Sequence, residues 1–175
     1  LAAAAVGTSL GLDLDEVAAA LSAARPASRW RMEVSTAPSG ATVVNDAYNA
    51  NPDSVRAALE ALSAMTRGGR RGTAVLGEMF ELGESSVDLH EQTGRDAARL
   101  GVDRLVAVGT SEPVAALVRG FALESGRPGD AVVVTDAGSA LAALGSLGAD
   151  DVVLVKASRA AGLERVAQSL TEVAS

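Results

Sequence analysis

Continuous apolar runs alternate with helical patterns over most of this chain, and this alternation limits the folds it can adopt. The apolar runs lie at residues 73–76, 105–108, 132–134 and 152–155. Helical patterns follow them, at residues 85–100, 112–124, 137–147 and 163–173. Strands that read as unbroken apolar runs are buried on both faces, as in parallel sheets whose crossovers are helices. The sequence therefore predicts an α/β fold with a mostly parallel sheet and helices on both faces.

The beginning of the chain has a different pattern. Residues 1–24 read as two alanine-rich helices separated by Gly11. Asp13 with Glu16 three residues later has the spacing of a capping box and predicts where the second helix begins. Proline disfavours helical geometry in the residue before it, so we interpret residues 25–28 as a linker. A short helical segment thus precedes the sheet.

The first strands after this linker have the pattern of a hairpin. Residues 31–36 and 42–44 flank a Pro-Ser-Gly turn at residues 38–40. The sequence therefore predicts one antiparallel edge strand in an otherwise parallel sheet.

Composition narrows the class of protein. A hydrophobic fraction of 48% in 175 residues is ample for a packed core. The net charge of −7 argues against a surface that neutralises phosphate backbones, so we expect no nucleic acid partner. The absence of cysteine excludes disulfides and thiolate zinc sites. No apolar run reaches the roughly 18 residues of a membrane span, and we expect a cytoplasmic protein.

One strand end carries a cluster of polar residues. Asp46 ends an apolar run, and ligands of open α/β sheets bind outside the carboxyl ends of the strands. Asn49 and Asn51 follow with amide donors and acceptors. Pro52 and Asp53 suit the first turn of a helix. The alternative is purely local, because Asn and Asp are common in turns and helix caps.

Lys156, the only lysine, stands at another strand end, followed by Ser158 and Arg159. Cations beside a helix N-terminus form a corner that suits a carboxylate or a phosphate. We expect this corner at a strand edge away from Asp46. The alternative is a solvated strand end.

Several motifs are absent from the sequence. It has no phosphate-cradling GxxxxGK[ST], no GxGxxG after a strand, and no GxSxG. His90 is the only histidine and lacks neighbours at metal-ligand spacing, so we assign no metal site and expect it to hydrogen-bond the loop at residues 78–84.

Three ordered strings resemble the Mur ligases. They are DAYNANPDS at residues 46–54, VLGEMFELG at residues 75–83 and LVKASR at residues 154–159. Trp30-Arg31-Met32-Glu33 is similar to the linker element of that family, with Trp30 in place of glycine, and Ala157 stands where glycine is usual. Three motifs in the family's order are more specific than any one of them.

This resemblance implies an architecture and a reaction. Residues 1–28 would be the last helices of a central ATPase domain with the linker, and residues 29–175 a Rossmann-like carboxyl-terminal domain of about six strands. The reaction implied is ATP-dependent amide formation in peptidoglycan synthesis. A UDP-N-acetylmuramoyl-tripeptide carboxylate is phosphorylated and then attacked by the amine of D-alanyl-D-alanine. Mg²⁺ would be bound mainly by the central domain, and the chain would act with the N-terminal and central domains as its partners.

The resemblance also implies site residues around the nucleotide. Arg31 would reach the ATP phosphates and act in catalysis, and Asp46 would lie near the ribose. Tyr48, Asn49 and Asn51 would face the nucleotide and the cleft between domains.

A second group would serve the incoming dipeptide. Lys156 is implied as a catalytic contact to the dipeptide or the phosphorylated intermediate, with Ser158 and Arg159 beside it.

Two alternatives remain open at this point. A receiver or flavodoxin-like regulatory module also has alternating strands and helices, although no phospho-acceptor aspartate follows residues 75–76 or 104–108. A sibling ligase that adds a different amino acid is the other, but the sibling adding the third residue typically has a DYAHxPD string where this chain has DAYNANPDS.

Overall fold

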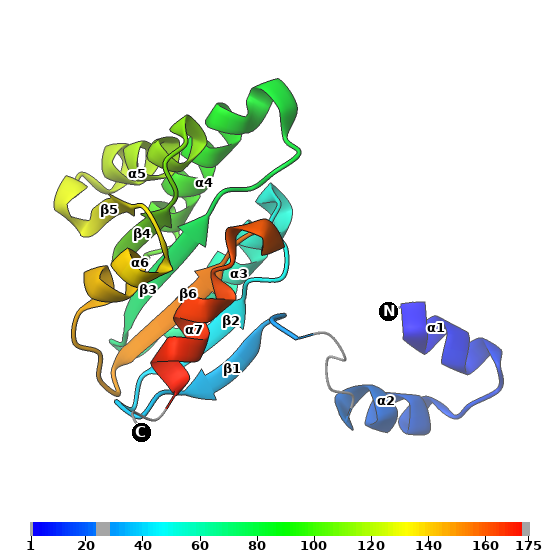
Figure 1. The fold of residues 1–175 in the computed structure, drawn as a ribbon. Coiled ribbons are helices and arrows are strands. Elements are labelled where there is room, and N and C mark those ends of the chain that lie inside the picture. Colours follow the sequence, from blue (N-terminus) through cyan, green and yellow to red (C-terminus); the bar gives the residue numbers. More distant parts are fainter. Residues whose placement is uncertain (1, 24–28, 173–175) are drawn as a thin grey trace.

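The computed structural model describes residues 2–23 and 29–172, and the second segment forms one six-stranded sheet (Figure 1). The strand order is β1-β2-β6-β3-β4-β5. The strands are β1 (Glu33–Thr36), β2 (Thr42–Asp46), β3 (Arg71–Gly77), β4 (Arg104–Val108), β5 (Ala131–Val134) and β6 (Asp151–Lys156). β1 runs antiparallel to β2, and every other pair is parallel. The predicted mostly parallel sheet with one antiparallel edge is confirmed.

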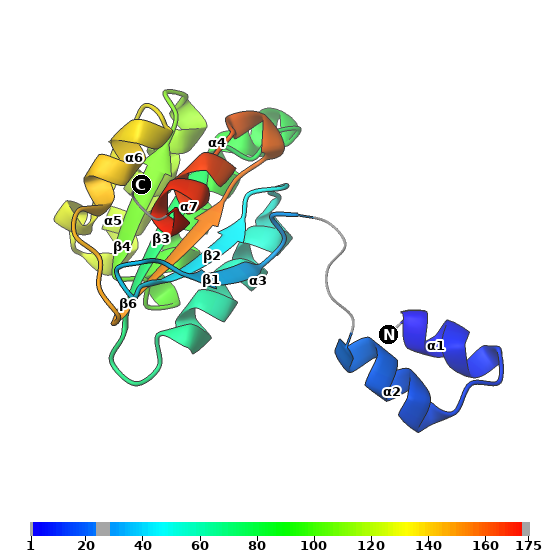
Figure 2. The ribbon, with the colours of Figure 1, turned by 60° about the horizontal axis from the view of Figure 1, so that its bottom comes forward.

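Helices cover both faces of the sheet (Figure 2). One face is covered by α3 (Pro52–Met65), α4 (Ser86–Arg99) and α5 (Glu112–Ser125). The other is covered by α6 (Ala137–Leu144) and α7 (Glu164–Thr171). Successive strand residues contribute to opposite cores: Val44 packs on the α3 side and Val43 on the α7 side. The central strands therefore read as unbroken apolar runs.

Helix ends follow local signals in the sequence. Pro52 opens α3, and Asn51 caps it by accepting the backbone N–H of Ser54. α6 ends at Leu144, three residues before the predicted end, because Gly145 has φ 65° and ψ −150° and leaves the helical region. The last predicted helix reached residue 173, which lies outside the described residues.

α4 and α5 approach each other closely at two glycines. A Cβ atom on Gly94 would collide with the carbonyl oxygen of Leu117, and one on Gly120 with that of Glu91. Both backbones therefore meet without intervening side chains, and no larger residue fits either position.

The first segment forms two helices, α1 (Ala2–Ser9) and α2 (Leu14–Ala23), as predicted. Asp13 accepts the backbone N–H of Asp15 and caps α2. Val17 is the buried residue of this pair and packs against Gly7. The predicted linker at residues 25–28 lies outside the described residues.

No helix in residues 2–23 or 29–172 combines the length and apolar character needed to cross a membrane.

Candidate functional site

Asp46 and Lys156 lie side by side at the carboxyl edge of the sheet. They are register partners at the ends of β2 and β6, so their side chains project to the same face. The ammonium of Lys156 donates to Asp46 Oδ2 at 2.6 Å and to the backbone oxygen of Asn49 at 2.8 Å. Lys156 is 2% exposed. The expectation that the lysine stands apart from Asp46 is wrong, because β6 inserts between β2 and β3.

Asp46 also holds the segment that enters the sheet domain. Its Oδ1 accepts the backbone N–H of Met32 at 3.0 Å, and the N–H of Tyr48 donates to the carbonyl of Trp30 at 3.2 Å. Trp30 and Met32 have φ values of 61° and 48°. Left-handed backbone costs a non-glycine residue about 1 kcal/mol, and these hydrogen bonds compensate for it. Arg31, between the two, is thereby fixed relative to the end of β2.

Cationic and aromatic side chains stack beside this network. The guanidinium of Arg31 lies 4.4 Å from the ring centroid of Tyr48. The guanidinium of Arg159 lies 5.8 Å from Tyr48 and 5.9 Å from Trp30. Such contacts orient a cation while leaving its hydrogen-bond donors available. The two arginines predicted for different ligands therefore share one aromatic surface.

A cavity of about 310 Å³ joins these residues. Its lining residues are Arg31, Asp46, Tyr48, Asn49, Asn51, Ser54 and Lys156. The first five of these were predicted to share a site, and they do line one cavity. Lys156 was expected elsewhere, but it lines the same cavity. Asn51 has a local role as well, because its Oδ1 accepts the N–H of Ser54 at 2.8 Å and Ser54 Oγ accepts the N–H of Asn51 at 3.1 Å.

Ser158 and the loop after β3 meet at the same edge. Ser158 is buried, and its Oγ accepts the backbone N–H of Phe80 at 3.4 Å. His90 Nε2 accepts the N–H of Met79 at 2.9 Å, and His90 Nδ1 lies 2.6 Å from the carbonyl of Ser86. The predicted hydrogen bond from His90 to this loop is confirmed. Burial lowers the pKa of His90, in keeping with a neutral ring that donates through Nδ1.

A second cavity, of about 450 Å³, opens between the loops after β3 and β6 and extends to β4 and α6. Glu78, Asp136 and Arg165 supply its charges, and Phe80 and Leu163 part of its apolar wall. Glu78 accepts a hydrogen bond from Ser111, and the backbone N–H of Ser139 helps to hold the pKa of the Asp136 carboxyl below its ordinary value. This cavity was not predicted from the sequence, in which Glu78 had no role beyond the loop at residues 78–84. The sequence feature that could have indicated the cavity is the VLGEMFELG string, because it continues beyond the end of β3 at Gly77.

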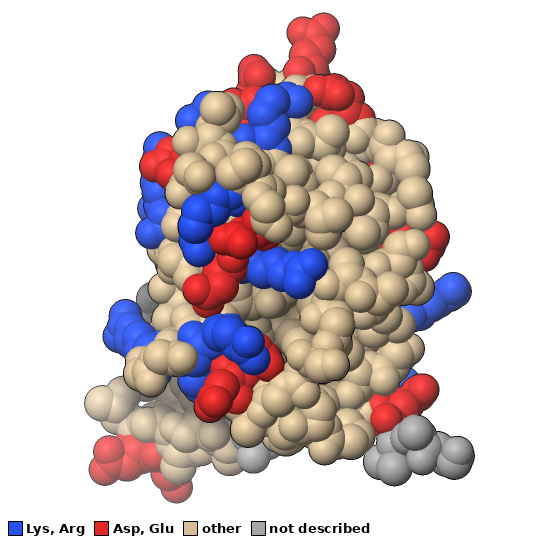
Figure 3. All heavy atoms as spheres, turned by 90° about the vertical axis from the view of Figure 1, so that its left-hand side faces the viewer, with Lys and Arg blue, Asp and Glu red and all other residues tan. Residues whose placement is uncertain are grey.

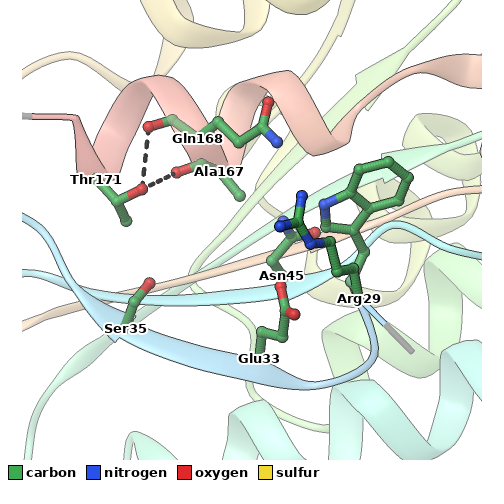
Figure 4. Close-up of a pocket in the computed structure, with 8 residues that line it drawn as sticks. Arg29, Glu33, Ser35, Asn45, Ala167, Gln168 and Thr171 are labelled. Carbon is green, nitrogen blue, oxygen red and sulfur yellow. Dashed lines mark hydrogen bonds between the residues drawn. The ribbon is translucent and has the colours of Figure 1, made fainter. Parts of the chain in front are cut away.

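A third cavity, of about 380 Å³, lies on the opposite face between β1 and α7 (Figure 4). Glu33 and Ser35 line it from the strand, and Gln168 and Thr171 from the helix (Figure 4). Trp30 also contributes to it. Arg31 lines the cavity on one face of β2, and its neighbour Trp30 lines the cavity on the other face.

The surface beside α4 and α5 has charges of both signs. Arg99 pairs with Glu124 at 2.9 Å, and Arg119 bridges Glu91 and Glu112 at 2.9 and 3.0 Å. Figure 3 shows Lys/Arg and Asp/Glu side chains interleaved on the face at the left of Figure 1. Within residues 2–23 and 29–172, no three His, Asp or Glu side chains cluster closely enough to hold a metal ion.

Fold and site together define an α/β domain whose crevice, at the carboxyl ends of its strands, presents two arginines and a buried ion pair. The family model described as "Mur ligase, glutamate ligase domain" matches residues 30–159. The chain belongs to the Mur ligase family, and the alternative of a receiver-like module is thereby set aside.

Individual relatives agree with this membership. A protein of Mycobacterium tuberculosis named UDP-N-acetylmuramoyl-tripeptide--D-alanyl-D-alanine ligase is 49% identical over 97% of this chain and 36% of its own length. The Bacillus subtilis protein of the same name is 31% identical over 98% of this chain and 37% of its own length. The chain thus spans little more than a third of these relatives.

Solved structures agree as well. MurF from Acinetobacter baumannii superposes with a TM-score of 0.77 at 28% identity, over 95% of this chain and 35% of that one. MurF ligase from Thermotoga maritima in complex with ADP gives 0.71 at 30% identity, with the same coverage.

Proposed function

We propose that this chain is the carboxyl-terminal part of an ATP-dependent ligase that joins D-alanyl-D-alanine to UDP-N-acetylmuramoyl-tripeptide in peptidoglycan synthesis, in the cytoplasm. Relatives at 31–49% identity carry the name of that reaction, and this chain covers little more than a third of each. The rest of the protein would supply the nucleotide-cradling loop, most of the Mg²⁺ ligands and the UDP-sugar site.

The domain division supports the same proposal. Residues 1–28 would end the preceding ATPase domain, and residues 29–175 would form the carboxyl-terminal domain. The family match begins at residue 30. Leu10 and Leu14 in the first segment are 76% and 68% exposed. Exposed leucines such as these are expected to be buried against another part of the full-length protein.

The observation that carries the proposal is the meeting of Arg31 with Asp46 and Tyr48 in one cavity. A guanidinium held over an aromatic ring can present its fork to phosphate oxygens as their charge develops. Asp46 has two carboxylate oxygens with further lone pairs for ribose hydroxyls, beyond the bonds from Met32 and Lys156. ATP supplies the phosphoryl group, and these residues would position it when the domains close.

The dipeptide would lie along the loop after β6. Ser158 and Arg159 begin that loop, and the second cavity lies on its far side. A crevice between strands whose connections leave in opposite directions is the general ligand position of open α/β sheets. Glu78 can pair with an ammonium there and Arg165 with a carboxylate, which matches a zwitterionic dipeptide.

The test uses the full-length protein. We expect phosphate release from ATP that depends on both UDP-N-acetylmuramoyl-tripeptide and D-alanyl-D-alanine, with the pentapeptide product detected by mass spectrometry. Single amino acids in place of the dipeptide form the comparison. Turnover with a single amino acid and none with the dipeptide would assign the chain to a sibling ligase.

A further inference from the structure

We propose that Lys156 is a positioning residue that fixes the linker arginine, Arg31, through the carboxylate of Asp46. The proposal rests on the ligase function above, in which Arg31 acts on the nucleotide. It replaces the direct contact between Lys156 and the dipeptide that the sequence resemblance implied.

The first link joins β6 to β2. Lys156 is 2% exposed, and the Asp46 side chain is 14% exposed. A buried ammonium must be paired, and the 2.6 Å bond to Asp46 Oδ2 and the 2.8 Å bond to the Asn49 carbonyl use two of its three donors. The lysine therefore holds the carboxylate in one orientation and ties the following loop to the same point.

The second link joins β2 to the segment that contains Arg31 and Met32. With Oδ2 bound to the ammonium, Oδ1 is directed at the N–H of Met32, at 3.0 Å. Met32 has a φ of 48°, a backbone conformation that needs such support. Arg31 precedes it and stacks on Tyr48 at 4.4 Å. An Asp46 side chain free to rotate would release the Met32 amide and change where the Arg31 guanidinium points.

The placement of the ammonium favours this role over contact with substrate. A lysine that binds a mobile ligand needs exposed donors, whereas this one has a single donor left and almost no exposed surface. The resulting chain of contacts runs from the centre of the sheet to the segment that precedes β1. It connects Lys156, Asp46, Met32 and Arg31.

Kinetics of the full-length protein separate positioning from contact. For Lys156→Met we expect kcat to fall about 100-fold, the cost of a misplaced catalytic group, with the KM for D-alanyl-D-alanine nearly unchanged. In an Asp46→Asn background the same substitution should change kcat by less than about threefold, because the charge it positions is already gone. Equal losses of kcat in both backgrounds, or a raised dipeptide KM with normal kcat, would overturn the proposal.

The comparison also works if the single variant fails to fold. Asp46→Asn/Lys156→Met contains no unpaired buried charge, and in Asp46→Asn the ammonium keeps the Asn49 carbonyl and gains an amide oxygen as acceptors. The ratio of their kcat values then carries the test. The matched control is Arg71→Met. Arg71 pairs with Asp151 at 2.9 Å at the opposite end of β6, and we expect wild-type kcat for its variant.

A structural readout keeps this proposal separate from the ligase function. Trp30 is the only tryptophan of the chain and adjoins Arg31. In the 175-residue chain, Lys156→Met should shift the Trp30 emission and speed hydrogen exchange at the Met32 amide, and Arg71→Met should do neither. Unchanged emission and exchange would reject the linkage. A full-length protein without dipeptide-dependent turnover would reject the proposed function, while these two measurements would still decide the linkage.

Discussion

His90 accepts the backbone N–H of Met79 through Nε2 at 2.9 Å, and this bond requires a neutral ring. Burial lowers the pKa of His90 below its ordinary value of 6.5. Below pH 6.5 the unfolded chain therefore binds more protons than the folded chain, and folding stability decreases as the pH falls through the lowered pKa.

This predicts a pH-dependent difference between the wild type and His90→Gln, whose side chain can accept the same N–H without titrating. The stability advantage of the wild type over the variant should be constant above about pH 7 and shrink toward pH 5. Urea unfolding between these pH values measures it. A difference that stays constant with pH would contradict the neutral role of His90.

The glycines at the α4–α5 crossing give a prediction on packing. Gly94→Ala or Gly120→Ala should lower the free energy of unfolding by about 1–3 kcal/mol, although alanine favours helix formation, because the added Cβ meets a carbonyl oxygen of the partner helix. Gly129→Ala is the control: its Cβ would enter open space. Stabilisation by either helix variant would show that the helices separate easily.

Arg31 gives a prediction on catalysis in the full-length protein. Arg31→Ala should lower kcat by about 10³-fold or more, as for arginines that stabilise a transferring phosphoryl group, with little change in nucleotide affinity. Arg31→Lys should recover only part of this, because lysine lacks the planar fork. A raised KM with normal kcat would contradict the role at the transition state.

Asn51 has two roles that can be separated. Asn51→Ala should cost about 1 kcal/mol of stability, since it removes the cap of α3. Asn51→Ser keeps a capping oxygen and should keep the stability. If the Asn51 amide also contacts the nucleotide, both variants will lower nucleotide affinity equally in calorimetry, whereas a purely local role predicts no loss for Asn51→Ser.

The 175-residue chain alone should show no ATP turnover, because its sequence lacks the GxxxxGK[ST] loop. The full-length protein is the positive control in a phosphate-release assay. Turnover by the short chain that is abolished in Asp46→Ala would contradict its proposed place within a larger enzyme.

The central strands β3, β4 and β6 were predictable from sequence because they are buried on both faces and contain unbroken apolar runs. The exposed edge strand β1 was predictable only from the turn that follows it. The strand order was not, since a run such as residues 152–155 does not specify its neighbours. That is why Lys156 was expected away from Asp46, although the two are register partners. Sequence motifs placed Arg31 and Asp46 at the site but could not place Glu78, whose cavity forms from four strand ends far apart in the chain.

Lys156 is the chain's only lysine and is almost fully buried, so the folded protein offers amine-acylating reagents no readily accessible lysine side chain. Acylation of the Lys156 amine would require its contacts with Asp46 and with the loop at Asn49 to open. The rate of labelling at Lys156, followed by mass spectrometry, would therefore report how often this strand end opens locally.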